Sequence, residues 1–178
     1  KMSNWGLSFS GFAQDLWSEQ LLNTDDQSKY ISEFRANVDF AVDLGIKGVR
    51  VDCVQPPTIH GEVDFDTLFN RLTKTWDTCI NYAADKGVYV TWEFEPGFAF
   101  NKPSYILKVL DKLQHTNFGL MYDTCHGQMM GVNGIRQEGE KEVVSDQVEL
   151  ISKFSGRINH IHLIDSDTYF FSEISDLE

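Results

Sequence analysis

Polar side chains that could bind a metal or move a proton follow several apolar runs of this sequence. The stretch "WEFEPG" places Glu93 and Glu95 at the end of the run "GVYVTWEF", and a Pro-Gly pair then stops that run. Asp123 ends the run "FGLMYD", and His162 lies in "INHIHLID". Carboxylates are rarely buried unless they are paired or bind a metal. Whether these residues can act together depends on where the helices and strands that carry them place their side chains.

Helical and strand-like patterns alternate along the chain. Apolar residues recur at helical spacing in four segments: 28–45, 64–87, 103–114 and 141–156. Runs typical of strands lie between and around them: 47–54, 88–95, 118–123, 158–165 and, more weakly, 4–12. The resulting order, β-α-β-α-β-α-β-α-β, is typical of parallel strands covered by helices.

Two α/β architectures fit this order, an open doubly wound sheet and part of a (β/α)8 barrel. The doubly wound sheet usually has a Gly-rich phosphate loop after a strand, and this sequence has none. The barrel carries its chemistry at the C-terminal ends of its strands. No linker or break in composition divides the chain, so we predict a single domain over residues 1–178.

Metal-binding residue types recur at the ends of the predicted strands: Asp52, Glu95, Asp123, His126 and His162. Two carboxylates and an imidazole from successive strands suit a divalent ion such as Mn²⁺, Mg²⁺, Co²⁺ or Zn²⁺. Each residue alone has a simpler explanation, such as a solvated strand end or a loop cap. Their recurrence at equivalent positions of adjacent strands favours a metal site.

Composition narrows the choice of partners. The formal charge of −12 argues against a general phosphate-binding surface and therefore against a nucleic-acid partner. No segment approaches the roughly 18 apolar residues of a membrane span, so no membrane contact is predicted. The three cysteines form no CxxC motif, which favours a reducing, cytoplasmic location.

The motifs "WEFEPG", "YDTCHG" and "HIHLIDSD" resemble those of the xylose isomerase-like TIM barrel family. The stretch "ANVDFAVDLGIKGVRV" resembles its repeating helix-then-strand unit, and the similarity covers about residues 28–166. The resemblance implies a partial (β/α)8 TIM barrel of about five parallel strands, the family's strands 3 to 7, with helices outside. The family includes sugar phosphate isomerases and epimerases, ketose 3-epimerases and endonuclease IV-like enzymes.

The resemblance assigns three metal ligands by motif position: Glu95, Asp123 and His162. Glu95 would also be the catalytic base, and His126 matches a histidine that touches substrate. Arg50 and Asp52 are weaker matches for residues that line the pocket. Glu93 and His160, each two residues before a ligand, are expected to lie deeper and not to reach the ion.

The family's fourth metal ligand, a glutamate of strand 8, has no counterpart, because "HLIDSD" is followed only by "TYFFSEISDLE". We therefore expect weakened metal affinity and little or no turnover from this chain alone. An arc of a barrel would also expose an apolar inner face, with Val49, Val51, Val90 and Leu120 near it. Such a face would lead to dimerisation or low solubility.

The leading interpretation is a divalent-metal-dependent sugar isomerase or epimerase that acts on a small sugar or sugar phosphate. Its reaction would be proton abstraction next to a carbonyl through a metal-stabilised enediolate. The alternative is a non-catalytic remnant that binds metal or sugar. An endonuclease IV-like phosphodiesterase ranks lower because it needs a basic surface and more histidines, and a glycosidase would leave "DTCH" and "HIH" unexplained.

Overall fold

Four parallel strands form the centre of the protein. The computed structural model describes residues 2–165. The strands are β1 (Gly48–Val51), β2 (Tyr89–Glu93), β3 (Phe118–Asp123) and β4 (Ile158–His162). They pair in chain order, β1-β2-β3-β4, and every pairing is parallel. Sequential parallel strands with helical connections are the arrangement of an arc of a (β/α)8 barrel, so the predicted partial barrel is confirmed.

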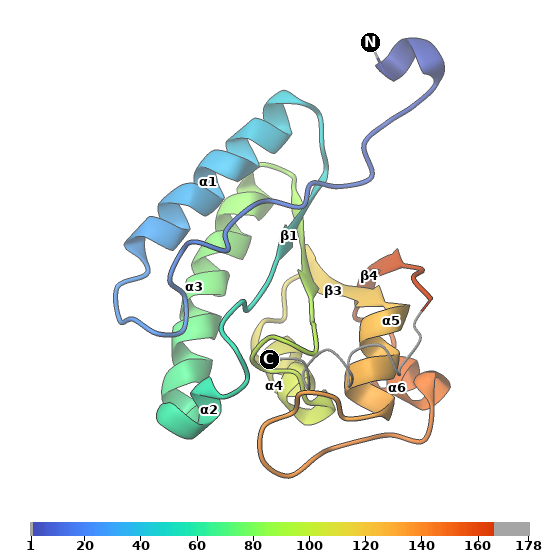
Figure 1. The fold of residues 1–178 in the computed structure, drawn as a ribbon. Coiled ribbons are helices and arrows are strands. Elements are labelled where there is room, and N and C mark those ends of the chain that lie inside the picture. Colours follow the sequence, from blue (N-terminus) through green and yellow to red (C-terminus); the bar gives the residue numbers. More distant parts are fainter. Residues whose placement is uncertain (1, 166–178) are drawn as a thin grey trace, which may run out of the picture.

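The connections between the strands supply the helices. They are η1 (Met2–Trp5), α1 (Ser28–Asp43), α2 (Ile59–Glu62), α3 (Phe65–Asp85), α4 (Pro103–Lys112), α5 (Thr124–His126), η2 (Gly127–Val132) and α6 (Gln147–Lys153). The two longest, α1 and α3, lie side by side against one face of the sheet (Figure 1). Asp64 begins α3 by accepting a hydrogen bond from the backbone N–H of Thr67 at 2.9 Å, an N-cap of the usual kind.

The apolar strand residues face the helices. Val49, Val51, Val90 and Leu120 are at most 1% exposed and belong to the core. Because successive side chains of a strand point to opposite faces, their neighbours such as Arg50 line the inner face, where a cavity of about 100 Å³ lies. The expectation that these four residues lie near an exposed inner face is therefore wrong, whereas dimerisation or low solubility stays a prediction.

The first predicted strand, 4–12, is almost absent. Its start is the η1 turn, and only Phe12 pairs with β1, through an isolated parallel bridge to Val49. Phe12 donates its N–H to Gly48 O at 2.8 Å and accepts from Arg50 N–H at 3.0 Å. Before that point the chain leaves the sheet edge (Figure 1), and Gly6 adopts a positive φ of 67°. The sheet within residues 2–165 thus has four strands rather than five.

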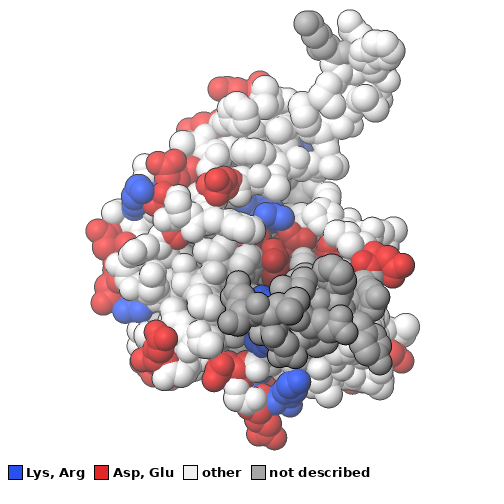
Figure 2. Space-filling model, viewed as in Figure 1, with Lys and Arg blue, Asp and Glu red and all other residues white. Residues whose placement is uncertain are grey.

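The described surface adds two observations. Within residues 2–165, no helix is long and apolar enough to cross a membrane. On the face shown in Figure 2, Lys and Arg side chains stand apart from one another rather than gathering in a patch. This face therefore lacks the clustered basic surface that binds a nucleic-acid backbone.

Candidate functional site

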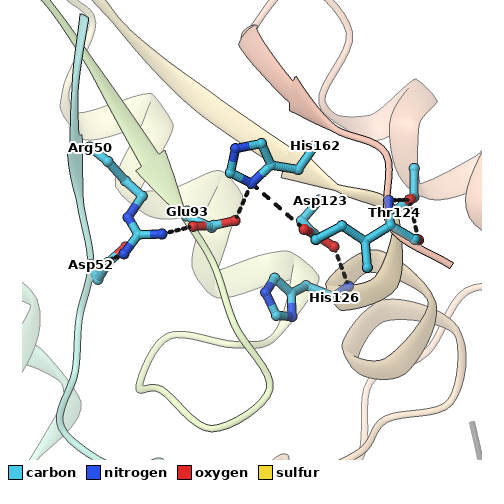
Figure 3. A network of polar contacts seen from close by, with 8 residues as sticks. Arg50, Asp52, Glu93, Asp123, Thr124, His126 and His162 are labelled. Atoms are coloured by element: carbon cyan, nitrogen blue, oxygen red, sulfur yellow. Dashed lines mark hydrogen bonds and ion pairs between the residues drawn. The ribbon is translucent and has the colours of Figure 1, made fainter. Parts of the chain in front are cut away.

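The carboxyl ends of the four strands bring charged side chains together, as Figure 3 shows. Asp123 of β3 lies directly opposite His162 of β4 in the sheet register. Glu93 at the end of β2 lies opposite Met121, two residues before Asp123. Parallel strands all end at the same edge of the sheet, so residues from distant parts of the sequence meet there.

Asp123 and His162 form the centre of this cluster. His162 Nδ1 lies 3.0 Å from Glu93 Oε1 and 3.8 Å from Asp123 Oδ2. Asp123 is completely buried, and its Oδ1 accepts the backbone N–H of His126 at 3.0 Å, which starts α5. Asp123 Oδ2 is buried without a hydrogen-bond partner among the described residues. Such an oxygen is costly to bury without a partner, and a carboxylate oxygen is a ligand that a divalent cation accepts.

Arg50 balances the carboxylates on the other side of the cluster. Its guanidinium lies 2.5 Å from Glu93 Oε2 and 3.2 Å from Asp52 Oδ2. The indole N–H of Trp17 also donates to Asp52 Oδ2, at 3.1 Å. The guanidinium predicted to line a substrate pocket thus pairs with two buried acids and borders the small inner-face cavity.

Burial shifts the protonation of three side chains at this site. It raises the pKa of Glu95 to about 7, an effect that the charges of Asp52 and Glu93 increase. It also raises the pKa of Asp52 to about 6, although Arg50 opposes the shift. Burial lowers the pKa of His126 below its ordinary value, so its ring is neutral at pH 7. Groups that exchange protons near neutral pH are suited to acid–base chemistry.

The predicted ligands are only partly brought together. Ligand atoms of Glu93, Asp123 and His162 lie within 4.8 Å of one another, and so do those of Asp52, Glu93 and Glu95. Of the predicted ligands, Glu95 thus belongs to the group of Asp52 and Glu93, whereas Asp123 and His162 belong to the other. Glu93, which was expected to lie deeper, belongs to both groups, because its long side chain reaches between Arg50 and His162.

A pocket of about 250 Å³ adjoins the cluster on the side of Glu95 and His126. It is lined by Trp17, Glu95, Pro96, Gly97, Phe98, Cys125, His126, Met129 and Arg136. Glu95 and His126 were expected at the site, whereas Trp17 and Arg136 were missed. Both lie in loops, where neither periodicity nor a motif marks them, and only the tertiary fold places them beside the strand ends.

Comparison with known proteins identifies the family of this chain. The family described as "Xylose isomerase-like TIM barrel" matches residues 3–173. The chain belongs to this family. An inosose dehydratase of Geobacillus thermodenitrificans is 23% identical over 176 residues, which cover 93% of this chain and 54% of the relative. This chain thus spans about half the length of the curated relatives it matches.

Solved structures show the same fold. The 3-keto-D-glucoside 4-epimerase of E. coli has a TM-score of 0.69 at 11% identity, over 92% of this chain and 61% of the epimerase. A xylose isomerase-like TIM barrel protein of Mycobacterium smegmatis, in complex with magnesium, has a TM-score of 0.65 at 16% identity. That match covers 90% of this chain and 52% of the other. At these identities the likeness establishes the fold alone.

Proposed function

We propose that this protein is a divalent-metal-dependent enzyme that removes a proton from the carbon next to a carbonyl group of a small sugar or cyclic polyol. Proton removal of this kind begins isomerisation, epimerisation and the elimination of water alike. It is thus common to the dehydratase and the epimerase that resemble this chain. The single observation that carries the proposal is the buried Asp123 Oδ2, which has no hydrogen-bond partner among the described residues and faces His162 at the strand ends.

The residues at this point fit a divalent cation. Asp123 Oδ2 lacks a hydrogen-bond partner within the described part of the chain, and His162 Nδ1 is 3.8 Å away. Carboxylate and imidazole ligands suit Mn²⁺, Mg²⁺, Co²⁺ or Zn²⁺. A bound cation would supply Lewis-acid polarisation of the substrate carbonyl.

We assign the third ligand to Glu95, although Glu93 lies nearer to His162. Arg50 already neutralises Glu93 at 2.5 Å. The charge of Glu95 is opposed by burial and by neighbouring carboxylates, which raise its pKa to about 7, so it gains more from a cation. If β2 continued in its register, Glu95 would also lie opposite Asp123, because Glu93 lies opposite Met121.

The side chains that face the pocket supply the proton chemistry. Glu95 lines the pocket, where its carboxylate is placed to accept a proton from the substrate and to return it. The neutral His126 ring lines the same pocket, and its buried Nδ1 has no hydrogen-bond partner among the described residues. We propose that His126 binds a substrate hydroxyl. Asp52, which is 7% exposed, accepts the indole N–H of the pocket residue Trp17 and would hold that side chain in the pocket wall.

Deuterium exchange tests this function whichever product the enzyme forms. The protein is incubated in D₂O with Mn²⁺ and a panel of ketoses and inososes, and exchange at the carbon next to the carbonyl is followed by NMR. We expect exchange that requires the metal and disappears in Asp123→Asn and Glu95→Gln. Exchange that persists in both variants would refute the proposal. Metal binding without exchange of any substrate would instead favour the alternative of a binding protein.

A further inference from the structure

The pocket beside Glu95 also has a positively charged residue in its wall. Glu95, His126 and Arg136 line the pocket together with the apolar side chains of Trp17, Phe98 and Met129. A molecule that placed its reacting carbon at Glu95 would share this pocket with the side chain of Arg136.

The backbone of Arg136 is unusual in a way that favours a role for its side chain. Its φ of 56° lies in the left-handed region, which residues with a Cβ rarely adopt. The same loop uses glycine at its two other positive-φ positions, Gly134 and Gly139. Glycine would be the unstrained choice at 136 as well. Strained residues of this kind are concentrated at ligand-binding positions.

Two buried amide side chains hold this strained turn in place. Asn101, 2% exposed, donates from Nδ2 to Pro96 O at 2.7 Å and to Arg136 O at 3.0 Å. Gln137, 8% exposed, donates to Met130 O at 2.9 Å. Asn101 thereby ties the turn directly to the residue that follows Glu95, so the distance between Arg136 and the strand-end cluster is fixed by the fold.

The guanidinium is directed back toward the loop after β2. A Cβ placed on Gly97 would lie 3.4 Å from Arg136 Nη1, so the side chain lies over Gly97. Gly97 also lines the pocket. The guanidinium therefore lies at the pocket wall, beside a residue two positions along the chain from Glu95.

We infer that Arg136 binds an oxyanion of the substrate, a carboxylate or a phosphate that the substrate carries in addition to its reacting carbonyl. The inference rests on the proposed function and names the substrate class of the same pocket. A planar guanidinium binds carboxylate and phosphate through paired hydrogen bonds. Arg50 pairs with Asp52 and Glu93, whereas the carboxylate of Glu95 in the same pocket would repel an anionic group that the positive charge of Arg136 attracts.

Binding of matched sugars tests the inference. D-glucose, D-glucuronate and D-glucose 6-phosphate differ only at carbon 6, and their affinities are measured by titration calorimetry at low salt with Mn²⁺ present. We expect one charged sugar to bind at least about tenfold more tightly than glucose. Which one does so distinguishes carboxylate from phosphate. The preference should vanish in Arg136→Gln and persist in part in Arg136→Lys, which keeps the charge but loses the paired geometry.

Two further variants complete the test. Arg157→Gln removes a distant arginine that pairs with Asp111, and it should keep the preference of the wild type. Arg136→Gly relieves the left-handed strain, so it should unfold at the same or a higher temperature and still lose the preference. This variant decides the matter if Arg136→Gln folds poorly.

Three results would overturn the inference: no difference among the sugars, no binding of any of them, or a preference that survives in Arg136→Gly. The last would show that the cation attracts the anion. If deuterium exchange still required the metal, only the role of Arg136 would be wrong. Loss of exchange across the whole panel would instead contradict the proposed function.

Discussion

Replacing Glu95 and Glu93 separately by glutamine distinguishes two acids that lie two residues apart. Glu95→Gln removes a charge that burial and neighbouring carboxylates disfavour. Glu93→Gln removes a charge that Arg50 compensates at 2.5 Å and that bonds His162 at 3.0 Å. The two variants should therefore have opposite effects on the free energy of unfolding in the absence of metal.

The magnitude for Glu95 follows from its protonation. Raising its pKa from the ordinary 4.5 to about 7 corresponds to at most ~3.4 kcal/mol at 1.36 kcal/mol per pH unit. Because the side chain is only half-buried, solvent screening reduces this to ~1–2 kcal/mol. The folded protein keeps the proton that the unfolded chain loses between pH 4.5 and 7, so this penalty grows as the pH rises through that interval. Glu95→Gln should thus be ~1–2 kcal/mol more stable than the wild type at pH 8 and equal to it below pH 4.5.

The magnitude for Glu93 follows from its buried ion pair. Removing one partner of such a pair costs ~3–5 kcal/mol, and the glutamine oxygen that still accepts from Arg50 reduces the loss to ~2–4 kcal/mol. Metal affinity should fall more in Glu95→Gln than in Glu93→Gln, although Glu93→Gln loses more stability. Mn²⁺ should bind at least ~10-fold more weakly to Glu95→Gln, which loses a ligand, and be less affected by Glu93→Gln.

Urea unfolding in a chelator and calorimetric titration of Mn²⁺ at pH 8 measure these effects. Glu62→Gln, an exposed acid of α2, serves as the control and should change neither quantity. Loss of Mn²⁺ binding in Glu93→Gln but not in Glu95→Gln would make Glu93 the third ligand. Wild-type binding by Glu95→Gln, Asp123→Asn and His162→Ala alike would show that this cluster is no metal site.

His60 of α2 and Asn101 of the loop after β2 should affect stability rather than chemistry. Burial lowers the pKa of His60 below its ordinary value of 6.5, and its Nε2 accepts the N–H of Phe100 at 3.2 Å. As the pH falls below 6.5, His60 is therefore protonated in the unfolded chain before it is protonated in the folded protein. The wild type should lose more unfolding free energy between pH 7.5 and 5.5 than His60→Gln. Equal losses in urea titrations would contradict this. Asn101→Ala leaves the carbonyls of Pro96 and Arg136 without their donor and should cost ~1–3 kcal/mol, whereas an unchanged urea midpoint would show that Asn101 does not hold the turn.

The types and order of the secondary-structure elements followed from local patterns. Helical periodicity placed α3, and apolar runs placed all four strands. These signals are local, because each depends on residues within one or two turns of the chain. The last predicted helix, 141–156, begins later, at Gln147, because Asp146 accepts from Glu149 N–H and caps it there.

Only the tertiary structure decided which face of the sheet each strand side chain points to. Val49 and Val51 were expected on the inner side, and both are buried against the helices. An apolar run covered on both faces has no alternation that shows which side faces the helices. A shift of one residue exchanges the two faces, so only the packing of the helices could assign them.

Sequence alone determined which residue types stand at the strand ends, because the spacing between an apolar run and the polar residue that stops it is local. Asp123 and His162 end adjacent parallel strands, and His162 Nδ1 lies 3.8 Å from Asp123 Oδ2. The contacts of Glu93 with Arg50 and His162 span 43 and 69 residues of sequence, and Asn101 reaches Arg136 across 35. Such contacts depend on where the chain returns in space. For this reason only the tertiary structure decided which acid lies beside His162 and which arginine borders the pocket.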